Sequence, residues 1–297
     1  MSEQFQIISD GSCDLPPGIT AQKRIRVIPF YVSFDGKDYR KELEEIDIRE
    51  FYQEMVNRKG VYPKTSLPSV QDYMDAFLPY AAEHIPMLVL CISTKLSGSM
   101  QSALSARELV LEDYPDAKIR IIDTTLCTVL QGLLVLEAAA MQERGAGFEE
   151  TVRRMEAIKT TGRIFFTVGN LEYLQAGGRI GRVAGIAGSL LGIRPVITMK
   201  EGEIFPSGIS RSRKKTLDKT IDLLKEFLQK CGGTIRKYSL AVGFGYDREE
   251  AEEYRKMVVE RLGGLLRLED LPLYQIGATI GVHTGPHPLG LGILERA

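Results

Sequence analysis

The chain has 297 residues, of which 44% are hydrophobic and 26% are charged, a balance that is typical of globular proteins. Its 38 Lys and Arg residues nearly balance its 39 Asp and Glu residues, and the formal net charge is -1. This charge gives no reason to expect nucleic acid or an anionic membrane surface as the main partner. The length suits one large domain or two ordinary domains.

The N-terminal sequence and the cysteine content favour a cytoplasmic location. The first residues enter a strand-like segment directly, without the basic stretch, apolar run and cleavage site of a signal peptide. No apolar run approaches the length of about 20 residues that a membrane helix needs. The four cysteines include no C-x-x-C pair, so a structural zinc site is not expected, and so few cysteines in a chain of this length fit a reducing compartment. We therefore expect a cytoplasmic protein without a metal or other cofactor.

Strand-like and helix-like segments alternate through the first half of the chain. Asp47 is placed to cap one helix, and the segment 69–72 (S-V-Q-D) has the outline of a capping box for the next. Buried strands that alternate with helices predict a mainly parallel sheet in a three-layer arrangement. The predicted strands are 5–9, 25–34, 87–92 and 118–122, and the predicted helices are 47–57, 69–83, 99–111 and 126–144.

Polar residues gather at the ends of these predicted strands. In an open parallel sheet, ligands bind beyond the carboxyl ends of the strands. The sequence therefore predicts that one region of the fold collects the following side chains: Asp10, Ser12, Ser97, Asp123 and Thr124.

The second half of the chain has a different pattern, with a β-hairpin at 195–207 that turns at Lys200-Glu-Gly202. We place a domain boundary near residue 160, which gives an N-terminal α/β domain (1–160) and a C-terminal α/β domain (161–297). The other predicted strands are 163–168, 239–245 and 274–282, and the other predicted helices are 148–159, 171–175, 183–191, 216–229 and 249–261.

Three short segments carry the polar groups most suited to a ligand: 65–69 (T-S-L-P-S), 95–99 (K-L-S-G-S) and 282–286 (V-H-T-G-P). Ser97 precedes a predicted helix whose first turn favours an anion. Thr65 precedes a Pro-shaped loop, and His283 ends a predicted strand. Hydroxyls and one imidazole suit the binding of a small anionic head group. Each residue alone also fits a structural role, as a helix cap, a turn residue or a strand-end histidine.

Other kinds of chemistry have weaker support in the sequence. The segment around Ser97 is not G-x-S-x-G, and neither a G-x-x-x-x-G-K-[ST] loop nor a G-x-G-x-x-G fingerprint is present. His283 and His287 lack a third metal ligand at suitable spacing. The remaining alternative is a hydrolase of acyl esters that uses Ser97 as nucleophile together with His283 and a nearby Asp.

Basic residues and small residues form two further features. Arg179 and Arg211 are candidates for docking an acidic partner or a phosphate-bearing ligand. The segment 183–191 is rich in Ala and Gly, which suits either close helix packing or space for an acyl chain.

The order of these motifs resembles the DegV family of fatty-acid-binding proteins over nearly the whole chain. The matching segments are 8–16 (I-S-D-G-S-C-D-L-P), 65–69, 92–103 (I-S-T-K-L-S-G-S-M-Q-S-A), 171–181 (L-E-Y-L-Q-A-G-G-R-I-G) and 283–286 (H-T-G-P). The chain differs from the family pattern at Leu67, where Gln is common, and at 287–288 (H-P), where Gly-Ala is common.

The resemblance implies a two-domain α/β fold with a C-terminal mixed sheet and a ligand tunnel between the domains. It implies a carrier, not an enzyme, that binds a long-chain fatty acid. Ser97, Thr65 and His283 correspond to the residues that hold the carboxylate. Some members present the fatty acid to an ATP-dependent kinase that makes acyl phosphate for phospholipid synthesis. In those members, the arginines that match Arg179 and Arg211 lie near the exposed head group.

Overall fold

The computed structural model describes residues 5–187, 194–232 and 234–297, and its N-terminal half is built on a parallel sheet. The strand order within these residues is β2-β1-β6-β7, and every neighbouring pair is parallel. All five residues of β6 are buried, as the unbroken apolar run predicts. The strands are β1 (Gln6–Asp10), β2 (Arg26–Ile28), β6 (Met87–Cys91) and β7 (Ile119–Asp123).

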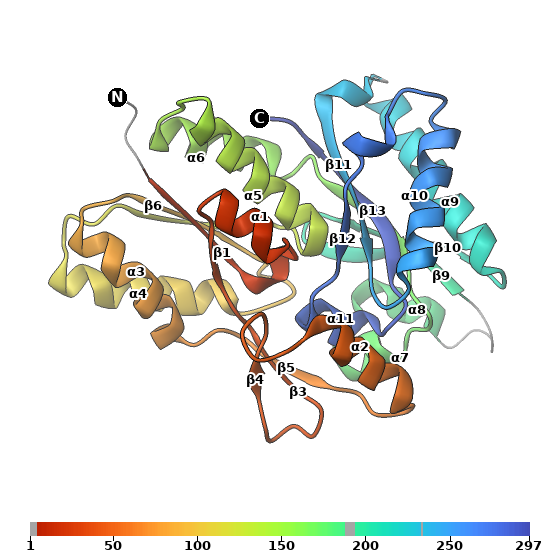
Figure 1. Ribbon diagram of the computed structural model, residues 1–297, viewed down its shortest axis with the longest axis horizontal. Helices are drawn as coiled ribbons and strands as arrows, with labels where there is room; N and C mark the ends of the chain where they lie inside the picture. Colours follow the sequence, from red (N-terminus) through yellow and green to blue (C-terminus); the bar gives the residue numbers. More distant parts are fainter. Residues whose placement is uncertain (1–4, 188–193, 233) are drawn as a thin grey trace.

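Helices cover both faces of this sheet, which confirms the predicted three-layer arrangement (Figure 1). One face packs on α3 (Val70–Ala82) and α4 (Ser99–Asp113), and the other packs on α5 (Thr128–Glu143). The predicted caps are confirmed at two helices. Asp47 accepts from the amides of Arg49 and Glu50, and Ser69 forms a capping box with Asp72. The remaining helical elements of this half are η1 (Gly11–Cys13), α1 (Pro17–Gln22), α2 (Ile48–Asn57) and α6 (Phe148–Ile158).

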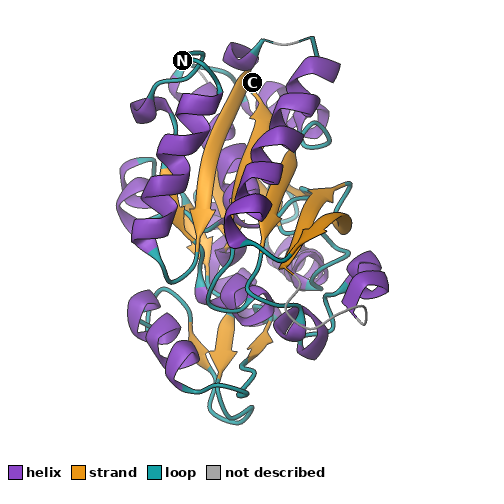
Figure 2. Ribbon diagram, turned by 90° about the vertical axis from the view of Figure 1, so that its right-hand side faces the viewer, coloured by secondary structure: helices purple, strands orange, loops and turns teal. Residues whose placement is uncertain are grey.

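The second sheet is mixed, as expected (Figure 2). Its order within the described residues is β10-β9-β8-β13-β11-β12, and the β11–β12 pair is parallel while the other neighbours are antiparallel. Helices α9 (Arg213–Lys230) and α10 (Arg248–Arg261) pack on one face. The strands are β8 (Arg163–Thr167), β9 (Arg194–Lys200), β10 (Glu203–Ser210), β11 (Tyr238–Phe244), β12 (Leu273–Gln275) and β13 (Leu289–Glu295).

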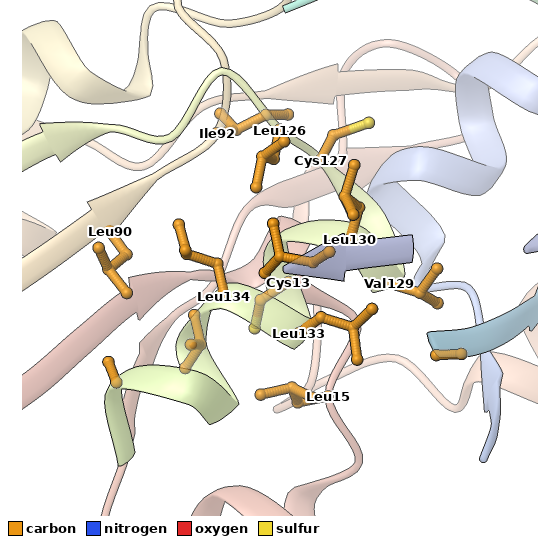
Figure 3. Packing of buried hydrophobic residues seen from close by; sticks show 14 of the residues in the cluster. Cys13, Leu15, Leu90, Ile92, Leu126, Cys127, Val129, Leu130, Leu133 and Leu134 are labelled. Atoms are coloured by element: carbon orange, nitrogen blue, oxygen red, sulfur yellow. The ribbon is translucent and has the colours of Figure 1, made fainter. Parts of the chain in front are cut away.

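Helix α5 joins the two halves into one core. Leu130 and Leu134 on α5 are fully buried, and they belong to a cluster that includes residues of both large sheets (Figure 3). Because α5 is apolar around most of its circumference, it is able to pack against both sheets at once.

A third, smaller sheet lies at the bottom of Figure 1 beside two short helices of the second half. Its order is β4-β3-β5, and it contacts α11 (Ala278–Thr284), while α11 packs on α7 (Glu172–Ala176). The Tyr52 hydroxyl on α2 donates to the carbonyl of Ile276 at 3.0 Å, which ties this sheet region to the start of α11. The strands are β3 (Tyr31–Ser33), β4 (Arg40–Lys41) and β5 (Lys64–Ser66), and the other short elements of the second half are η2 (Gly181–Val183), α8 (Ala184–Ala187), η3 (Ile235–Lys237) and η4 (Leu268–Asp270).

The predicted strand at 274–282 is wrong. The strand β12 ends at Gln275, and the helix α11 follows, so His283 lies near the end of a helix. The amides of Gly277 and Thr279 donate to the buried carboxylates of Asp14 and Glu42 at 2.9 and 3.0 Å. These distant carboxylates supply partners for the first turn of α11, and a β-branched sequence therefore becomes helical.

Three other predictions need correction or lie outside the described residues. The predicted strand 25–34 is divided between β2 and β3, which belong to different sheets. Thr65, which was expected in a loop, lies on β5, and the last strand, β13, was not predicted. In the predicted helix 183–191, α8 ends at Ala187, and residues 188–191 lie outside the described residues.

The predicted domain boundary at residue 160 falls between the end of α6 at Ile158 and the start of β8 at Arg163. The division into 1–160 and 161–297 stays a prediction. In the described ranges, no helix is both long enough and apolar enough to cross a membrane.

Candidate functional site

A cavity of about 270 Å³ lies between the loops that follow the parallel sheet and the six-stranded sheet, beside α11. Its walls come from β5, the loop after β6, the start of α5, the inner face of the six-stranded sheet and one face of α11. Most of this lining is apolar, which suits a hydrocarbon ligand. The large apolar side chains in the wall include Phe30, Ile92, Leu96, Ile164, Phe166, Met199, Ile204, Ile276 and Ile280.

The cavity is elongated across the six-stranded sheet. Its lining includes residues of five consecutive strands, from β10 through β9, β8 and β13 to β11. Neighbouring strands lie about 4.8 Å apart, so four spacings correspond to about 19 Å. Ile204 marks the β10 end, and Gly243 marks the β11 end.

The polar residues predicted as a site lie around one end of this cavity. Thr65, Ser97, His283 and Arg179 all line it, although they come from four separate parts of the chain. Thr65 Oγ1 lies 3.0 Å from His283 Nε2. The structure thus brings together all three residues that were predicted to bind a carboxylate.

The carboxylate of Asp10 holds the Ser97 loop in place. Its Oδ2 accepts from the Ile92 amide and from the Ser99 hydroxyl, both at 2.9 Å, so one buried group holds the loop on both sides of Ser97. The Ser99 amide donates to Ser97 Oγ at 3.2 Å. This bond leaves the Ser97 hydroxyl hydrogen free to point at a ligand, and it strengthens that hydroxyl as a donor.

His283 is neutral near pH 7. Burial, followed by the positive charge of Arg179, lowers the pKa of His283 to about 4. Among the described residues, Nδ1 has no hydrogen-bond partner, so a proton on that atom would be buried without an acceptor. The favoured tautomer therefore carries its proton on Nε2 and donates to Thr65 Oγ1. The Thr65 hydroxyl hydrogen is then available to an anionic ligand.

Gly177 allows the imidazole to pack against the backbone that follows α7. A Cβ atom at position 177 would collide with Nδ1 and Cε1 of His283. The Gly-Gly turn of the 171–181 motif therefore has a steric role at the site, in addition to ending α7.

Arg179 and Arg211 differ in their relation to the cavity. Arg179 is exposed, and its guanidinium donates to the carbonyls of Leu96 and Gly177 at 3.1 and 2.7 Å. It also lines a second, more open cleft of about 490 Å³ that shares Ser97 with the cavity. Arg211 is exposed between β10 and α9, and the described linings of the cavity and of this cleft do not include it.

Two buried carboxylates beside the cavity were missed in the sequence. Glu42 Oε2 accepts the hydroxyl of Thr279, and Asp14 Oδ2 accepts the hydroxyl of Thr128, each at 2.5 Å. Both threonines line the cavity, so these bonds direct their hydroxyl groups away from a ligand. Glu42 is 237 residues from Thr279 in the sequence, and no local motif signals this contact.

Burial shifts the pKa values of these two acids upward. It raises the pKa of Glu42 to about 7, and it raises the pKa of Asp14 with a further contribution from the charge of Glu42. The hydrogen bonds from Thr279 and Thr128 act in the opposite direction without cancelling the shift.

The 287–288 segment, where the chain differs from the family pattern, contributes to two cavities. Pro288 lines the elongated cavity, whereas His287 lines a separate cavity of about 330 Å³ and packs edge-on against Tyr246. Within the described residues, no group of three or more His, Cys, Asp and Glu side chains is arranged to hold a metal ion.

Comparisons with known proteins agree with this fold. The model of the DegV family, described as uncharacterised proteins, matches residues 4–296. A DegV domain-containing protein of Clostridium perfringens is 32% identical over 285 residues, which cover 95% of this chain and 94% of that protein.

Two solved structures are similar over almost the full length of the chain. A stearic acid-binding protein from Eubacterium ventriosum has a TM-score of 0.94 and 41% identity, with 99% of each chain covered. A DegV family protein from Thermus thermophilus, described by its fatty acid binding, has a TM-score of 0.85 and 30% identity, with 98% of this chain and 99% of that chain covered. From the extent of the family match and these likenesses, the chain belongs to the DegV family.

Proposed function

We propose that this protein is a carrier that binds one long-chain fatty acid in the elongated cavity, with the carboxylate at Ser97, Thr65 and His283. The observation that carries the proposal is a mostly apolar cavity that Ser97, Thr65 and His283 line together. The fatty-acid-binding relatives from Eubacterium ventriosum and Thermus thermophilus support it.

The two ends of the ligand have different roles in this binding. Each buried methylene contributes about 0.8 kcal/mol, so the hydrocarbon tail supplies most of the affinity. The hydroxyls of Ser97 and Thr65 donate to the carboxylate and fix its position. Neutral His283 acts through Thr65, and Arg179 supplies the positive charge beside the head group.

The same arrangement supports a carrier over the alternative of an acyl-ester hydrolase. A serine hydrolase needs a base that contacts its nucleophile and an acidic group that orients the base. Here Nε2 of His283 contacts Thr65, and within the described residues its Nδ1 has no partner. Ser97 therefore lacks the support that would make it a nucleophile.

The carboxylate end adjoins the open cleft, and this position suits presentation of the head group to a second protein. We include in the proposal that an ATP-dependent fatty acid kinase docks near Arg179 and Arg211 and phosphorylates the carboxylate. The acyl phosphate would then serve phospholipid synthesis in the cytoplasm. The exposure of both arginines supports this part of the proposal.

The binding step is tested by replacing Ser97 with alanine and measuring the dissociation constant for a saturated C18 fatty acid. Loss of one hydrogen bond to a charged group costs about 1.5–3 kcal/mol, so we expect about 10-fold to 150-fold weaker binding. Unchanged affinity would contradict the assignment of Ser97. Turnover of an acyl ester by the wild type that is lost in Ser97→Ala would favour the hydrolase.

The docking step needs a separate variant. In a reconstituted assay with a fatty acid kinase, Arg211→Glu should lower acyl-phosphate formation and leave fatty-acid affinity unchanged. Arg236→Glu, at an exposed position on η3, is the matched charge control and should leave both unchanged. Equal rates in the two variants would contradict docking at Arg211.

A further inference from the structure

One wall of the elongated cavity runs from the carboxylate site toward the β11 end. Ile276, Thr279, Ile280 and His283 line the cavity along α11 and the residues just before it. A helix rises about 1.5 Å per residue, so Ala278 at the start of α11 and His283 are about 7.5 Å apart along this wall, and Ile276 lies before the first turn. With the carboxylate at His283, as proposed above, the tail points toward Ile276.

Gly243 lies at this far end. A Cβ atom added at position 243 would lie 3.5 Å from Ile276 Cδ1 and 3.0 Å from Val129 Cγ1. Both neighbours line the cavity, and Val129 belongs to the first turn of α5 (Figure 3). The missing side chain at position 243 thus leaves space that Val129 borders.

Gly292, on the neighbouring strand β13, lies outside the described cavity lining. Gly292 on β13 is paired with Ala241, whereas Gly243 is paired with Gly290, which also lines the cavity. A Cβ atom at position 292 would lie 3.4 Å from Val129 Cγ2 and 3.6 Å from Leu130 Cα, which are ordinary contacts. The described cavity lining does not include Gly292, so this glycine serves the packing of α5.

We propose that Gly243 and Val129 form the stop that sets the longest acyl chain the cavity accepts. The proposal rests on fatty-acid binding as the function of the cavity, and it assigns the specificity to two residues. A methyl group at position 243 forces Val129 to shift and shortens the cavity. Removal of the Val129 methyl groups lengthens it.

The test compares the dissociation constants of saturated C14, C16 and C18 fatty acids for four proteins: the wild type, Gly243→Ala, Val129→Ala, and the double variant. Each methylene left outside the cavity costs about fourfold in affinity, from about 0.8 kcal/mol per methylene. We expect Gly243→Ala to weaken C18 binding relative to C14 by at least about fourfold. Val129→Ala should shift the preference toward longer chains, and the double variant should restore C18 binding relative to Gly243→Ala.

Gly292→Ala is the matched control, because it adds the same methyl group on the neighbouring strand outside the cavity. Its chain-length profile should equal that of the wild type. If the wild type binds all three fatty acids and Gly243→Ala has the same chain-length profile, this inference is overturned and the proposed function is not. If Gly243→Ala does not fold, an unchanged profile in Val129→Ala overturns it equally. A wild type that binds no fatty acid overturns this inference and the proposed function together.

Discussion

Replacing Thr65 with valine tests the hydrogen-bond relay from His283 to the ligand. Valine has the shape of threonine and suits a strand, and β5 pairs with β3 through the backbone at this position. The change removes a hydroxyl that lies 3.0 Å from His283 Nε2. A hydrogen bond to a charged group contributes about 1.5–3 kcal/mol, so fatty-acid affinity should fall by about 10-fold to 150-fold.

A double-mutant cycle with His283→Ala separates a relay from two independent contacts. In a relay, His283 acts only through Thr65, so the double variant should bind about as weakly as Thr65→Val alone. Two independent contacts would instead give additive losses of binding free energy. His283→Gln retains a donor on the side chain and should recover part of the affinity lost in His283→Ala.

The assay is calorimetric titration with a saturated C18 fatty acid and with its methyl ester. The ester retains the hydrocarbon tail but lacks the negative charge, so its affinity should depend much less on Thr65. Wild-type affinity of Thr65→Val for the acid, or strictly additive losses in the cycle, would refute the relay.

Two further predictions concern the buried acids and the imidazole. Burial raises the folded pKa of Glu42 to about 7 from 4.5, so this group stabilises the fold most below pH 4.5, and its contribution is lost as the pH rises through 7. Relative to Glu42→Gln, the wild type should therefore lose up to about 3 kcal/mol of unfolding free energy between pH 4 and pH 8 in urea titrations; parallel pH profiles would contradict this. Gly177→Ala should displace His283 and weaken fatty-acid binding, whereas Gly185→Ala, whose added Cβ would have no atom of the described residues within 4 Å, should not. Equal affinities in the two glycine variants would show that contact with Gly177 does not position the imidazole.

Locally encoded structure was predictable from the sequence. Helices α2 and α3 begin where Asp47 and Ser69 predict, because the capping side chain and its amide partners are only two or three residues apart. The strand β6 was equally clear, because its unbroken apolar run is buried on both faces.

Structure that depends on distant contacts was not predictable. The apolar, β-branched segment before His283 suggests a strand, yet α11 is stabilised by Asp14 and Glu42, which lie more than 200 residues away. The segment 25–34 likewise serves two sheets, because its two ends pair with β1 and with β5. Sequence patterns within one window do not contain such contacts.

The candidate site also has a part that was predictable from the sequence and a part that was not. Thr65, Ser97 and His283 were predicted from the family resemblance, and the structure places all three around one end of the cavity. The sequence predicted Asp10 in the same region as Ser97, but the hydrogen bond from Ser99 to Asp10 became visible only in three dimensions. The same holds for the roles of Glu42 and Gly177, because each acts through contacts with a distant part of the chain.

The central claim is tested most directly by mass spectrometry of an organic extract from protein purified without added lipid. The account predicts one fatty acid per chain, a tail of defined length, and loss of this ligand in Ser97→Ala. Protein that carries no fatty acid, and that also fails to bind added C14 to C18 fatty acids, would contradict it.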